Sequence, residues 1–174
     1  FQHSTRGLYR MISGVDRNIG RILAELERLD LTDNTIIIFT SDHGMFYGER
    51  GLCDCWLLHE ESLRVPLLVY DPRTAHSGLP RHEMVLNIDI APTILDLAGI
   101  PAPTTYQGRS LAPLLQNQTV AWREDFLCEH HFTHPTIPKS EGLRSQDWKY
   151  SRYYEQDPYT NASTTCKSTL TKPP

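Results

Sequence analysis

The residue pair Asp42-His43 is the part of the sequence whose side chains are best suited to bind a metal ion. A carboxylate and an imidazole are both metal ligands, and Gly44 after them allows a close backbone approach. The pair directly follows the apolar, β-branched run 35–40, which predicts a strand buried on both faces. Ligands of open α/β sheets bind at the carboxyl ends of strands, where this pair lies. Taken alone, the two residues are better explained as a loop cap and a partly exposed polar side chain than as metal ligands.

Charged residues after this pair offer further chemistry. Arg50 could contact an anionic group through its guanidinium fork, or it could simply pair with its neighbour Glu49. Glu60, Glu61 and Arg64 form a second charged cluster. For that cluster we expect ion pairs along one helical turn rather than catalysis.

The cysteines and histidines have spacings that argue against a shared metal site. Cys53 and Cys55 form a C-x-C pair, and Cys128 and Cys166 stand far away. Zinc sites typically use paired C-x₂-C ligands, so free thiols are favoured.

A second dense patch contains Glu129 and three histidines, His130, His131 and His134. Adjacent residues of a strand point to opposite faces, so these histidines cannot all bind one ion, although one could line a pocket. Asn161-Ala162-Ser163 is a glycosylation sequon, which has meaning only in a secreted eukaryotic chain.

The elements that must position these residues follow from hydrophobic periodicity. A helix is predicted at 5–29, buried strands at 35–40 and 65–70, and a long functional loop at 41–58. A short strand at 84–88, a helix capped by Asp89 at 89–98, and a helical turn capped by Ser110 follow. Short strand-like runs fill 125–130, 142–144 and 148–154.

This order predicts an α/β fold, with a mostly parallel sheet flanked by helices and a smaller C-terminal antiparallel subdomain. We assign 1–120 to the α/β domain, 121–156 to the subdomain and 157–174 to an irregular tail.

Composition narrows the function classes. Of 174 residues, 39% are hydrophobic and 22% charged, as in globular proteins, and the formal net charge is −4. That charge argues against nucleic acid or an anionic membrane as partner. No apolar run approaches the roughly 20 residues of a membrane span. The chain begins without Met and almost inside its first helix, so we expect it to be part of a longer protein.

Several stretches, in the same order, resemble the sulfatase family of the alkaline phosphatase superfamily. Residues 33–44 read DNTIIIFTSDHG and resemble the family's "DNTxxxFTSDHG", and residues 60–69, EESLRVPLLV, resemble "EESxRVPLxV". Residues 15–23 (VDRNIGRIL), 89–100 (DIAPTILDLAGI) and 107–111 (QGRSL) occur where sulfatases have similar stretches. Residues 142–144 and 148–150 resemble strands of the family's smaller subdomain.

The resemblance implies hydrolysis of a sulfate ester with the help of a divalent cation, usually Ca²⁺. By position, Asp42 and His43 match one pair of the family's metal ligands. A formylglycine, made from the Cys or Ser of a C/S-x-P-x-R motif, would attack sulfur. Partners would be a sulfated small molecule or glycan. The compartment is unknown, and an extracytoplasmic one is expected from the family only.

Three departures from the family pattern affect this expectation. No Cys or Ser of this chain is followed by x-Pro-x-Arg, and the family's first two Asp ligands have no counterpart. Residues 48–55, GERGLCDC, align with a stretch close to G-E-H-G-L-W-x-K, which places Cys55 at the sulfate-binding Lys and Arg50 at the His. We therefore predict that the isolated chain is inactive. A phosphoryl or phosphonate ester hydrolase of the same superfamily and a non-catalytic, decayed copy are the alternatives.

Overall fold

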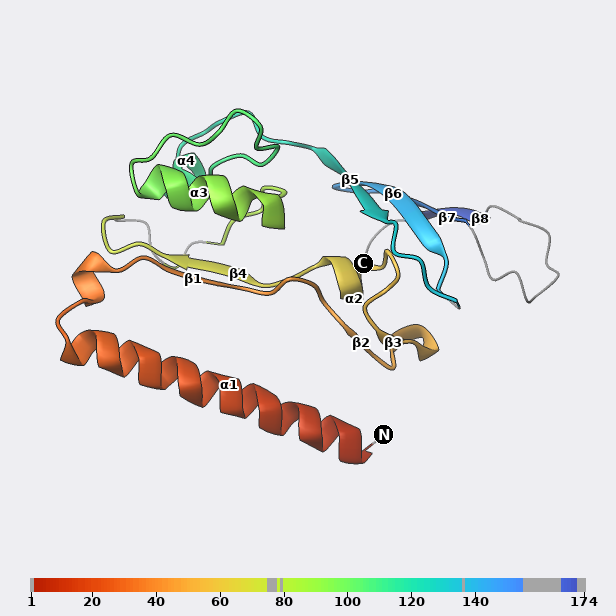
Figure 1. Cartoon of the computed structure of the whole chain (residues 1–174), viewed down its shortest axis with the longest axis horizontal. Helices are drawn as coiled ribbons and strands as arrows, with labels where there is room; N and C mark the ends of the chain where they lie inside the picture. Colours follow the sequence, from red (N-terminus) through yellow and green to blue (C-terminus); the bar gives the residue numbers. More distant parts are fainter. Residues whose placement is uncertain (1, 75–77, 79, 136, 155–166, 172–174) are drawn as a thin grey trace. The chain divides into compact units, whose positions relative to one another are not determined.

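The computed structural model describes all residues except 1, 75–77, 79, 136, 155–166 and 172–174 (Figure 1). The chain divides into two compact units. The first unit comprises Phe1–Ile38 and Leu68–Ser77, and the second comprises Phe39–Leu67 and Gly78–Pro174. The residues proposed from the sequence to bind a metal or substrate all lie in the second unit.

The first unit contains one long helix and the start of a strand pair. Helix α1 (Gln2–Arg28) confirms the helix predicted from the apolar periodicity. Much of its apolar stripe is open to solvent, with Ile12, Val15 and Ile22 each more than half exposed. After a 3₁₀ turn at Thr32–Asn34, strand β1 (Ile37–Thr40) pairs with β4 (Leu67–Tyr70) (Figure 1). Both strands were predicted, but their expected burial on both faces is wrong within this chain, because their residues are half-buried or exposed. No helix in the described part of the chain is both long enough and apolar enough to span a membrane.

The loop after β1 folds back on itself as a small hairpin. Strands β2 (Phe46–Tyr47) and β3 (Cys53–Asp54) pair antiparallel, joined by a 3₁₀ turn at Glu49–Gly51. Gly48 begins that turn with φ 114°, a left-handed conformation that glycine adopts without strain. The sequence predicted a loop here without this hairpin. Helix α2 (Glu60–Leu63) then leads to β4.

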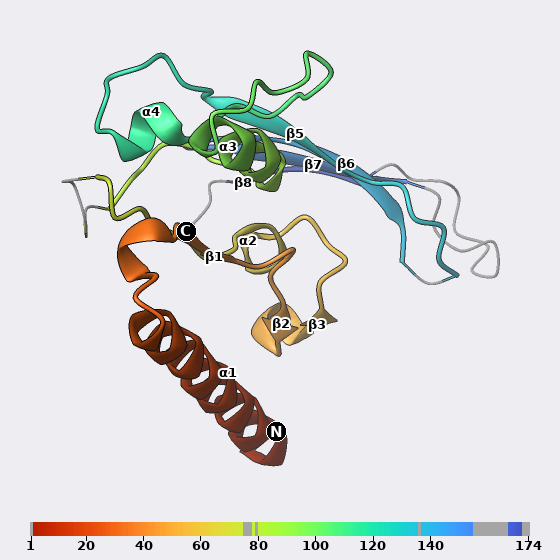
Figure 2. The ribbon, with the colours of Figure 1, turned by 60° about the vertical axis from the view of Figure 1, so that its left-hand side comes forward.

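Two short helices lie next to each other in the second unit (Figure 2). These are α3 (Ile90–Leu97), which confirms the helix predicted there, and α4 (Ala112–Leu115). The strand predicted at 84–88 is wrong, because the chain is irregular there and then forms a 3₁₀ turn, η3 (Asn87–Asp89).

Asp89 explains this difference. Its fully buried carboxylate accepts hydrogen bonds from the backbone N–H groups of Leu86 and Arg109, both 2.8 Å away, and pairs with the guanidinium of Arg123. The carboxylate thus takes the donor of Leu86 that a strand ladder would need, and it makes no capping bond to α3.

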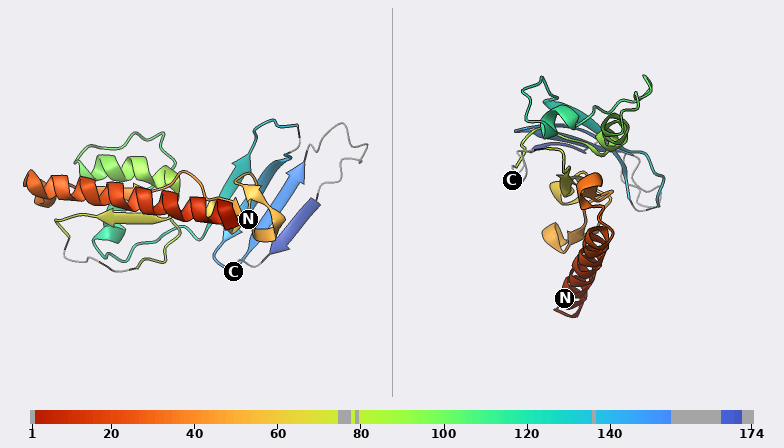
Figure 3. Two further views of the ribbon diagram at one scale, coloured as in Figure 1. Left: turned by 90° about the horizontal axis from the view of Figure 1, so that it is seen from below. Right: turned by 90° about the vertical axis from the view of Figure 1, so that its left-hand side faces the viewer.

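The C-terminal part of the second unit is an antiparallel sheet, as predicted. Its strands follow in the order β5 (Asp125–His130), β6 (Lys139–Ser145), β7 (Lys149–Tyr154) and β8 (Lys167–Thr171) (Figure 3). Strand β8 lies within the stretch expected to be an irregular tail. The register places Cys128 opposite Gly142, and a Cβ at Gly142 would lie 3.1 Å from Cδ1 of the buried Leu58. This face therefore packs directly on the segment between β3 and α2.

Candidate metal centre

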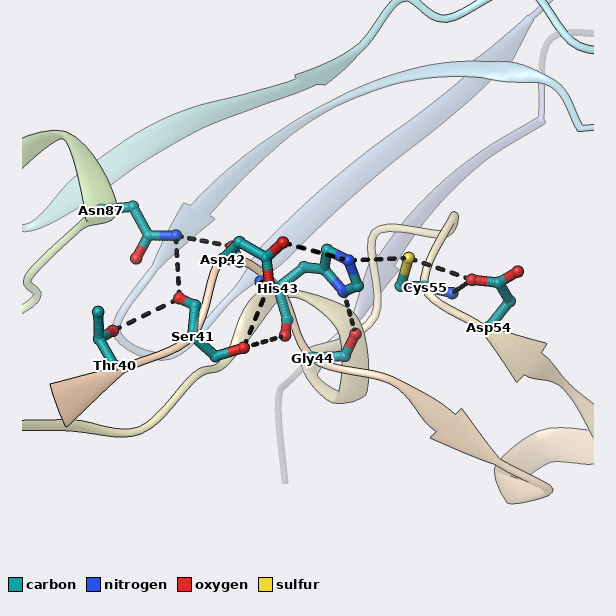
Figure 4. Close-up of polar contacts among 8 residues, drawn as sticks. All are labelled: Thr40, Ser41, Asp42, His43, Gly44, Asp54, Cys55 and Asn87. Carbon is teal, nitrogen blue, oxygen red and sulfur yellow. Dashed lines mark hydrogen bonds and ion pairs between the residues drawn. The ribbon is translucent and has the colours of Figure 1, made fainter. Parts of the chain in front are cut away.

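Asp42 and His43 direct their polar atoms to the same place. Oδ2 of Asp42 lies 3.7 Å from Nε2 of His43 (Figure 4). Two ligands that are each about 2.4 Å from one cation lie about 3.4 Å apart when they meet it at a right angle. The two side chains are 84% and 47% exposed, respectively, so the space between them is open to solvent. The spacing thus fits two ligands of one ion with room for others.

A backbone hydrogen bond fixes the orientation of the His43 ring. Nδ1 lies 2.8 Å from the carbonyl oxygen of Gly44. Because a carbonyl can only accept, Nδ1 must carry the proton and Nε2 of the neutral ring presents its lone pair. This is the arrangement that orients metal-binding imidazoles in proteins. The donor chemistry therefore fits a divalent cation.

The Asp42 carboxylate is also held in place. Its Oδ1 accepts a hydrogen bond of 2.9 Å from the backbone N–H of His43. That bond, followed by the charge of a protonated His43, lowers the pKa of Asp42, and a contact from Ser41 acts in the same direction. At neutral pH the carboxylate is ionised, as a metal ligand must be.

Asn87 ties this loop to a distant turn. Its side-chain Nδ2 donates to the carbonyl of Asp42 at 2.7 Å and to that of Ser41 at 3.5 Å (Figure 4). Asn87 belongs to η3, whose conformation depends on the buried Asp89. The sequence analysis did not identify Asn87. The only available indication was its place two residues before Asp89, next to the stretch 89–100 that resembles the sulfatase pattern.

Gly44 brings the loop against α2. Its N–H donates to the carbonyl of Ser62 at 2.7 Å, and a Cβ at Gly44 would lie 2.0 Å from the carbonyl oxygen of Glu61. No side chain can be accommodated at that separation. The expectation of a close backbone approach at this glycine is thus confirmed by the contact with α2.

Cys55 lies on the other side of the His43 ring. Its Sγ is 3.7 Å from Nε2 of His43 and donates to Oδ1 of Asp54 at 3.2 Å. Burial is the largest cause that raises the pKa of the Cys55 thiol, and the hydrogen bond and charge of Asp54 add to it. A neutral thiol therefore occupies the position that the alignment gives to a cationic lysine.

The charged cluster after the loop pairs differently from the sequence expectation. Glu61 Oε1 contacts Nε of Arg50 at 3.3 Å, whereas Glu49 accepts from the backbone N–H of Tyr47. Arg50, with φ 55°, keeps a half-exposed side chain. The pair of Arg50 with Glu49 that the sequence suggested is therefore not formed. Nor do Glu60 and Glu61 pair within the helical turn, as was expected. The partners of Glu60 lie on the C-terminal sheet instead.

Glu60 joins α2 to that sheet. Its carboxylate contacts Nε of Arg144 at 3.0 Å and Nζ of the buried Lys149 at 3.2 Å. Burial alone would raise the pKa of Glu60, but the two cations more than offset it and the pKa is lowered. Glu60 thus has the structural role that was predicted, but its partners are distant in the sequence.

The cysteines proposed from the sequence as possible metal ligands do not form a metal site among the described residues. Cys53, Cys55 and Cys128 are free thiols, while Cys166 and the sequon at Asn161 lie outside the described residues. Within the described ranges, no three or more His, Cys, Asp or Glu side chains are grouped so that they could hold a metal ion. Among the described residues, Asp42 and His43 therefore form a pair of candidate ligands without a third beside them.

His131 lies apart from His130 and His134, as expected for adjacent residues of a strand, whereas the other two both contact Trp56. The half-buried His130 ring packs edge-on against Trp56 at 5.4 Å. His131 is exposed, with Nε2 3.2 Å from Glu129 and Nδ1 3.2 Å from the Tyr154 hydroxyl. Trp56 and Asp54 were not singled out from the sequence, because Asp54 stands at the variable position of the stretch 48–55 and Trp56 lies just after it.

Two protein families match parts of this chain. The family described as N-sulphoglucosamine sulphohydrolase, C-terminal, matches residues 48–162, about two thirds of the chain. The family described as type I phosphodiesterase / nucleotide pyrophosphatase matches residues 3–65.

Curated relatives and solved structures agree with these matches. N-acetylglucosamine-6-O-sulfatase of Bacteroides thetaiotaomicron is 37% identical over 88% of this chain and 28% of its own length. Human arylsulfatase K is 36% identical over 83% of this chain and 28% of its own length. A solved structure of a protein in complex with its substrate D-glucosamine-2-N,6-O-disulfate has a TM-score of 0.80 and 35% identity, over 91% of this chain and 32% of that one. A phosphonate monoester hydrolase from Silicibacter pomeroyi has a TM-score of 0.78 and 25% identity, over 91% of this chain and 32% of its own.

The chain thus spans less than a third of the length of these relatives. The structural neighbours confirm the α/β fold with its C-terminal antiparallel sheet. Together, the match over residues 48–162 and the relatives at 36–37% identity show that this chain belongs to the sulfatase family of the alkaline phosphatase superfamily, in whose members it corresponds to the C-terminal portion.

Proposed function

We propose that this chain contributes the C-terminal part of a metal-dependent sulfuric ester hydrolase. The observation that carries the proposal is the convergence of Asp42 Oδ2 and His43 Nε2, 3.7 Å apart, beyond the end of β1. The named sulfatases among its relatives support the same reaction class. The substrate class we infer is a sulfated glycan or sulfated small molecule, since one relative is named for N-acetylglucosamine and a neighbour holds a disulfated glucosamine.

Asp42 and His43 would hold the cation, and we infer Ca²⁺ because one donor is a carboxylate and the site is open to further oxygen ligands. A divalent cation bound there would polarise a sulfate oxygen as a Lewis acid. Residues of the chain itself present the ionised carboxylate and the Nε2 lone pair. The formylglycine expected of the family would come from outside these 174 residues, because no Cys or Ser here lies in the C/S-x-P-x-R motif.

Metal binding by the chain can be tested directly with paramagnetic Mn²⁺. We expect Mn²⁺ to broaden the amide NMR signals of residues 42–44 before all others. Asp42→Asn should require at least about tenfold more Mn²⁺ for the same broadening, because the ionised ligand is lost. Excess Ca²⁺ should reverse the broadening by competition.

The matched control for this titration is Asp147→Asn, which removes an exposed carboxylate of the same unit between β6 and β7. That variant should behave like the unmodified chain. Broadening that is spread over many surface carboxylates, or that Asp42→Asn leaves unchanged, would count against the metal site.

Few positively charged side chains near Asp42 and His43 are available to bind a sulfate group. We propose Arg50 as a contact to the sulfate group, although Glu61 neutralises part of its charge. Cys55 supplies no positive charge, because a thiol is neutral when protonated and negative when ionised. A sulfatase built with this chain should therefore turn over its substrate slowly.

A chimeric enzyme tests that expectation. In it, this chain replaces the matching portion of the Bacteroides N-acetylglucosamine-6-O-sulfatase, and hydrolysis of N-acetylglucosamine 6-sulfate is measured. Cys55→Lys should raise kcat/KM at least about tenfold, because a charge-assisted hydrogen bond to sulfate is restored. A folded chimera in which Cys55→Lys changes nothing would show that the loop alignment is wrong.

A second candidate, phosphonate or phosphate ester hydrolysis, is favoured by two relatives. The phosphonate monoester hydrolase shares the fold over 91% of this chain, and a multifunctional alkaline phosphatase superfamily protein from Trinickia caryophylli is 36% identical over 70% of it. The same chimera, assayed with a phosphonate monoester and with a sulfate ester, decides between the two. If neither ester is hydrolysed by the folded chimera or by its Cys55→Lys variant, the non-catalytic alternative is supported.

A further inference from the structure

Four aromatic rings gather near Asp42 and His43, which we call the proposed metal pair or simply the metal pair, and take no part in the function proposed above. Trp56 stacks on Phe132, with ring centroids 5.6 Å apart and planes at 29°, and on His134, at 6.0 Å and 28°. His130 meets Trp56 edge-on at 5.4 Å. We call Trp56, His130, Phe132 and His134 the aromatic platform.

The platform is more open than a packed core. Phe132 is 57% exposed, whereas the buried apolar side chains of the described residues, such as Phe46 and Leu58, are at most 8% exposed. Trp56, His130 and His134 are half-buried. An exposed aromatic side chain among half-buried rings, with imidazole groups beside it, offers a small molecule both apolar and polar contacts.

A continuous line of contacts joins the platform to the metal pair. The carboxylate of Asp54 accepts hydrogen bonds from the Sγ and the backbone N–H of Cys55, the residue directly before Trp56. The same Sγ lies 3.7 Å from Nε2 of His43. The platform therefore begins one residue after the thiol that borders the metal pair.

The chemistry of the platform matches a sugar ring. The C–H groups on one side of a pyranose form an apolar patch that can pack on an aromatic face, while its hydroxyl groups need donors and acceptors at the rim. The geometry points to the aromatic platform as a subsite for the pyranose ring of a sulfated glucosamine residue, whose sulfate group would extend toward Asp42 and His43. This inference rests on the proposed function for the sulfate end only, because ring stacking needs no metal.

Ligand-observed NMR on the 174-residue chain tests the inference. The probes are N-acetylglucosamine, N-acetylglucosamine 6-sulfate and the open-chain polyol glucitol, each with EDTA and with Ca²⁺. We expect N-acetylglucosamine to receive saturation at its ring C–H protons and to shift the Trp56 indole N–H signal, which Trp56→Phe identifies. Glucitol should do neither, because it has no ring face.

Phe132→Ala should weaken binding of N-acetylglucosamine about fivefold to tenfold. Leu127→Ala, which removes an equally exposed apolar side chain of the preceding strand β5, is the matched control and should leave the affinity unchanged. Backbone amide spectra of both variants establish that they are folded. Equal losses in the two variants, or no Trp56 shift with N-acetylglucosamine, would overturn the platform.

The two proposals fail in different ways. If the metal pair is wrong and the platform right, N-acetylglucosamine binds in EDTA and Ca²⁺ alike, and its 6-sulfate gains nothing from Ca²⁺. If the platform is wrong and the metal pair right, Ca²⁺ still competes with Mn²⁺ at residues 42–44 while Phe132→Ala has no effect on sugar binding.

Discussion

At the scale of single residues, the metal pair is ordered by backbone contacts rather than by burial. Asp42 and His43 are largely exposed, yet each has a fixed partner. The Gly44 carbonyl fixes the His43 ring and Asn87 holds the carbonyl of Asp42. A ligand pair held in this way loses little conformational freedom when a cation binds, which favours binding.

Gly44 gives a sharp test of this ordering. In Gly44→Ala the new methyl group would overlap the carbonyl oxygen of Glu61, so the loop or α2 must move. We expect the free energy of unfolding to fall by about 2 kcal/mol or more and Mn²⁺ broadening at residues 42–44 to be lost. Urea unfolding and the Mn²⁺ titration measure the two effects.

Gly20→Ala is the control for that substitution. Nothing lies within 4 Å of a Cβ at Gly20, which is exposed on α1. Alanine should there stabilise the helix by about 0.5–1 kcal/mol and leave the metal titration unchanged. An unaltered titration in Gly44→Ala would mean that the contact with α2 does not position the pair.

The sequence predicted the metal pair but not what supports it, and the reason is distance along the chain. Asp42 and His43 are adjacent, follow an obvious strand and match the family's pattern, so the sequence alone was enough to propose them as ligands. Asn87 reaches Asp42 across 45 residues, and Trp56 meets His130 across a longer separation. Such contacts depend on tertiary packing, about which periodicity carries no information.

At the scale of elements, α2 is the junction between the metal loop and the C-terminal sheet. Its backbone contacts Gly44, and its Glu60 side chain binds Arg144 of β6 and Lys149 of β7. The two cations are directly opposite each other in the sheet register. One carboxylate thus neutralises two neighbouring positive charges on a largely buried face.

This pairing predicts an acid-sensitive junction. The pKa of Glu60 is lowered in the folded chain, so its stabilising effect is complete above the unfolded value of 4.5 and is lost as pH falls through the folded pKa. Glu60→Gln should cost on the order of 2 kcal/mol at neutral pH. In urea unfolding, the difference between the two proteins should shrink as the pH falls from neutrality to below 4.5.

Glu141→Gln is the matched control, because Glu141 pairs with Arg152 on the same sheet but at its surface. Surface pairs contribute about 0–1 kcal/mol, so this variant should differ little from the unmodified chain at any pH. A Glu60→Gln variant with the same small, pH-independent effect would rule out the junction.

Elements were predictable where periodicity was strong. The apolar spacing of α1 and the β-branched run of β1 each left one interpretation. Residues 84–88 carry similar apolar residues but form no strand, because the carboxylate of Asp89 takes the N–H of Leu86. The hairpin of β2 and β3 has only two residues a strand, too few to show alternation.

At the scale of the whole molecule, many large apolar side chains of the described residues are exposed, whereas few are buried. Ile12 and Ile22 of α1, and Phe39 and Leu68 of the strand pair, are between 39% and 62% exposed. The relatives that share this fold are about three times longer. These faces are therefore the places where a longer sulfatase chain would find partners for burial.

The last prediction concerns activity of the 174 residues alone. Two proposed ligands, Asp42 and His43, leave a cation mostly hydrated, the protonated Cys55 offers no charge to a sulfate, and no C/S-x-P-x-R nucleophile is encoded. Catalysis requires a nucleophile and charge stabilisation together. The chain should therefore release no p-nitrophenol from p-nitrophenyl sulfate above the rate of a buffer blank, with or without Ca²⁺. Ca²⁺-dependent turnover that disappears in Asp42→Asn would show instead that these residues form a complete catalytic centre.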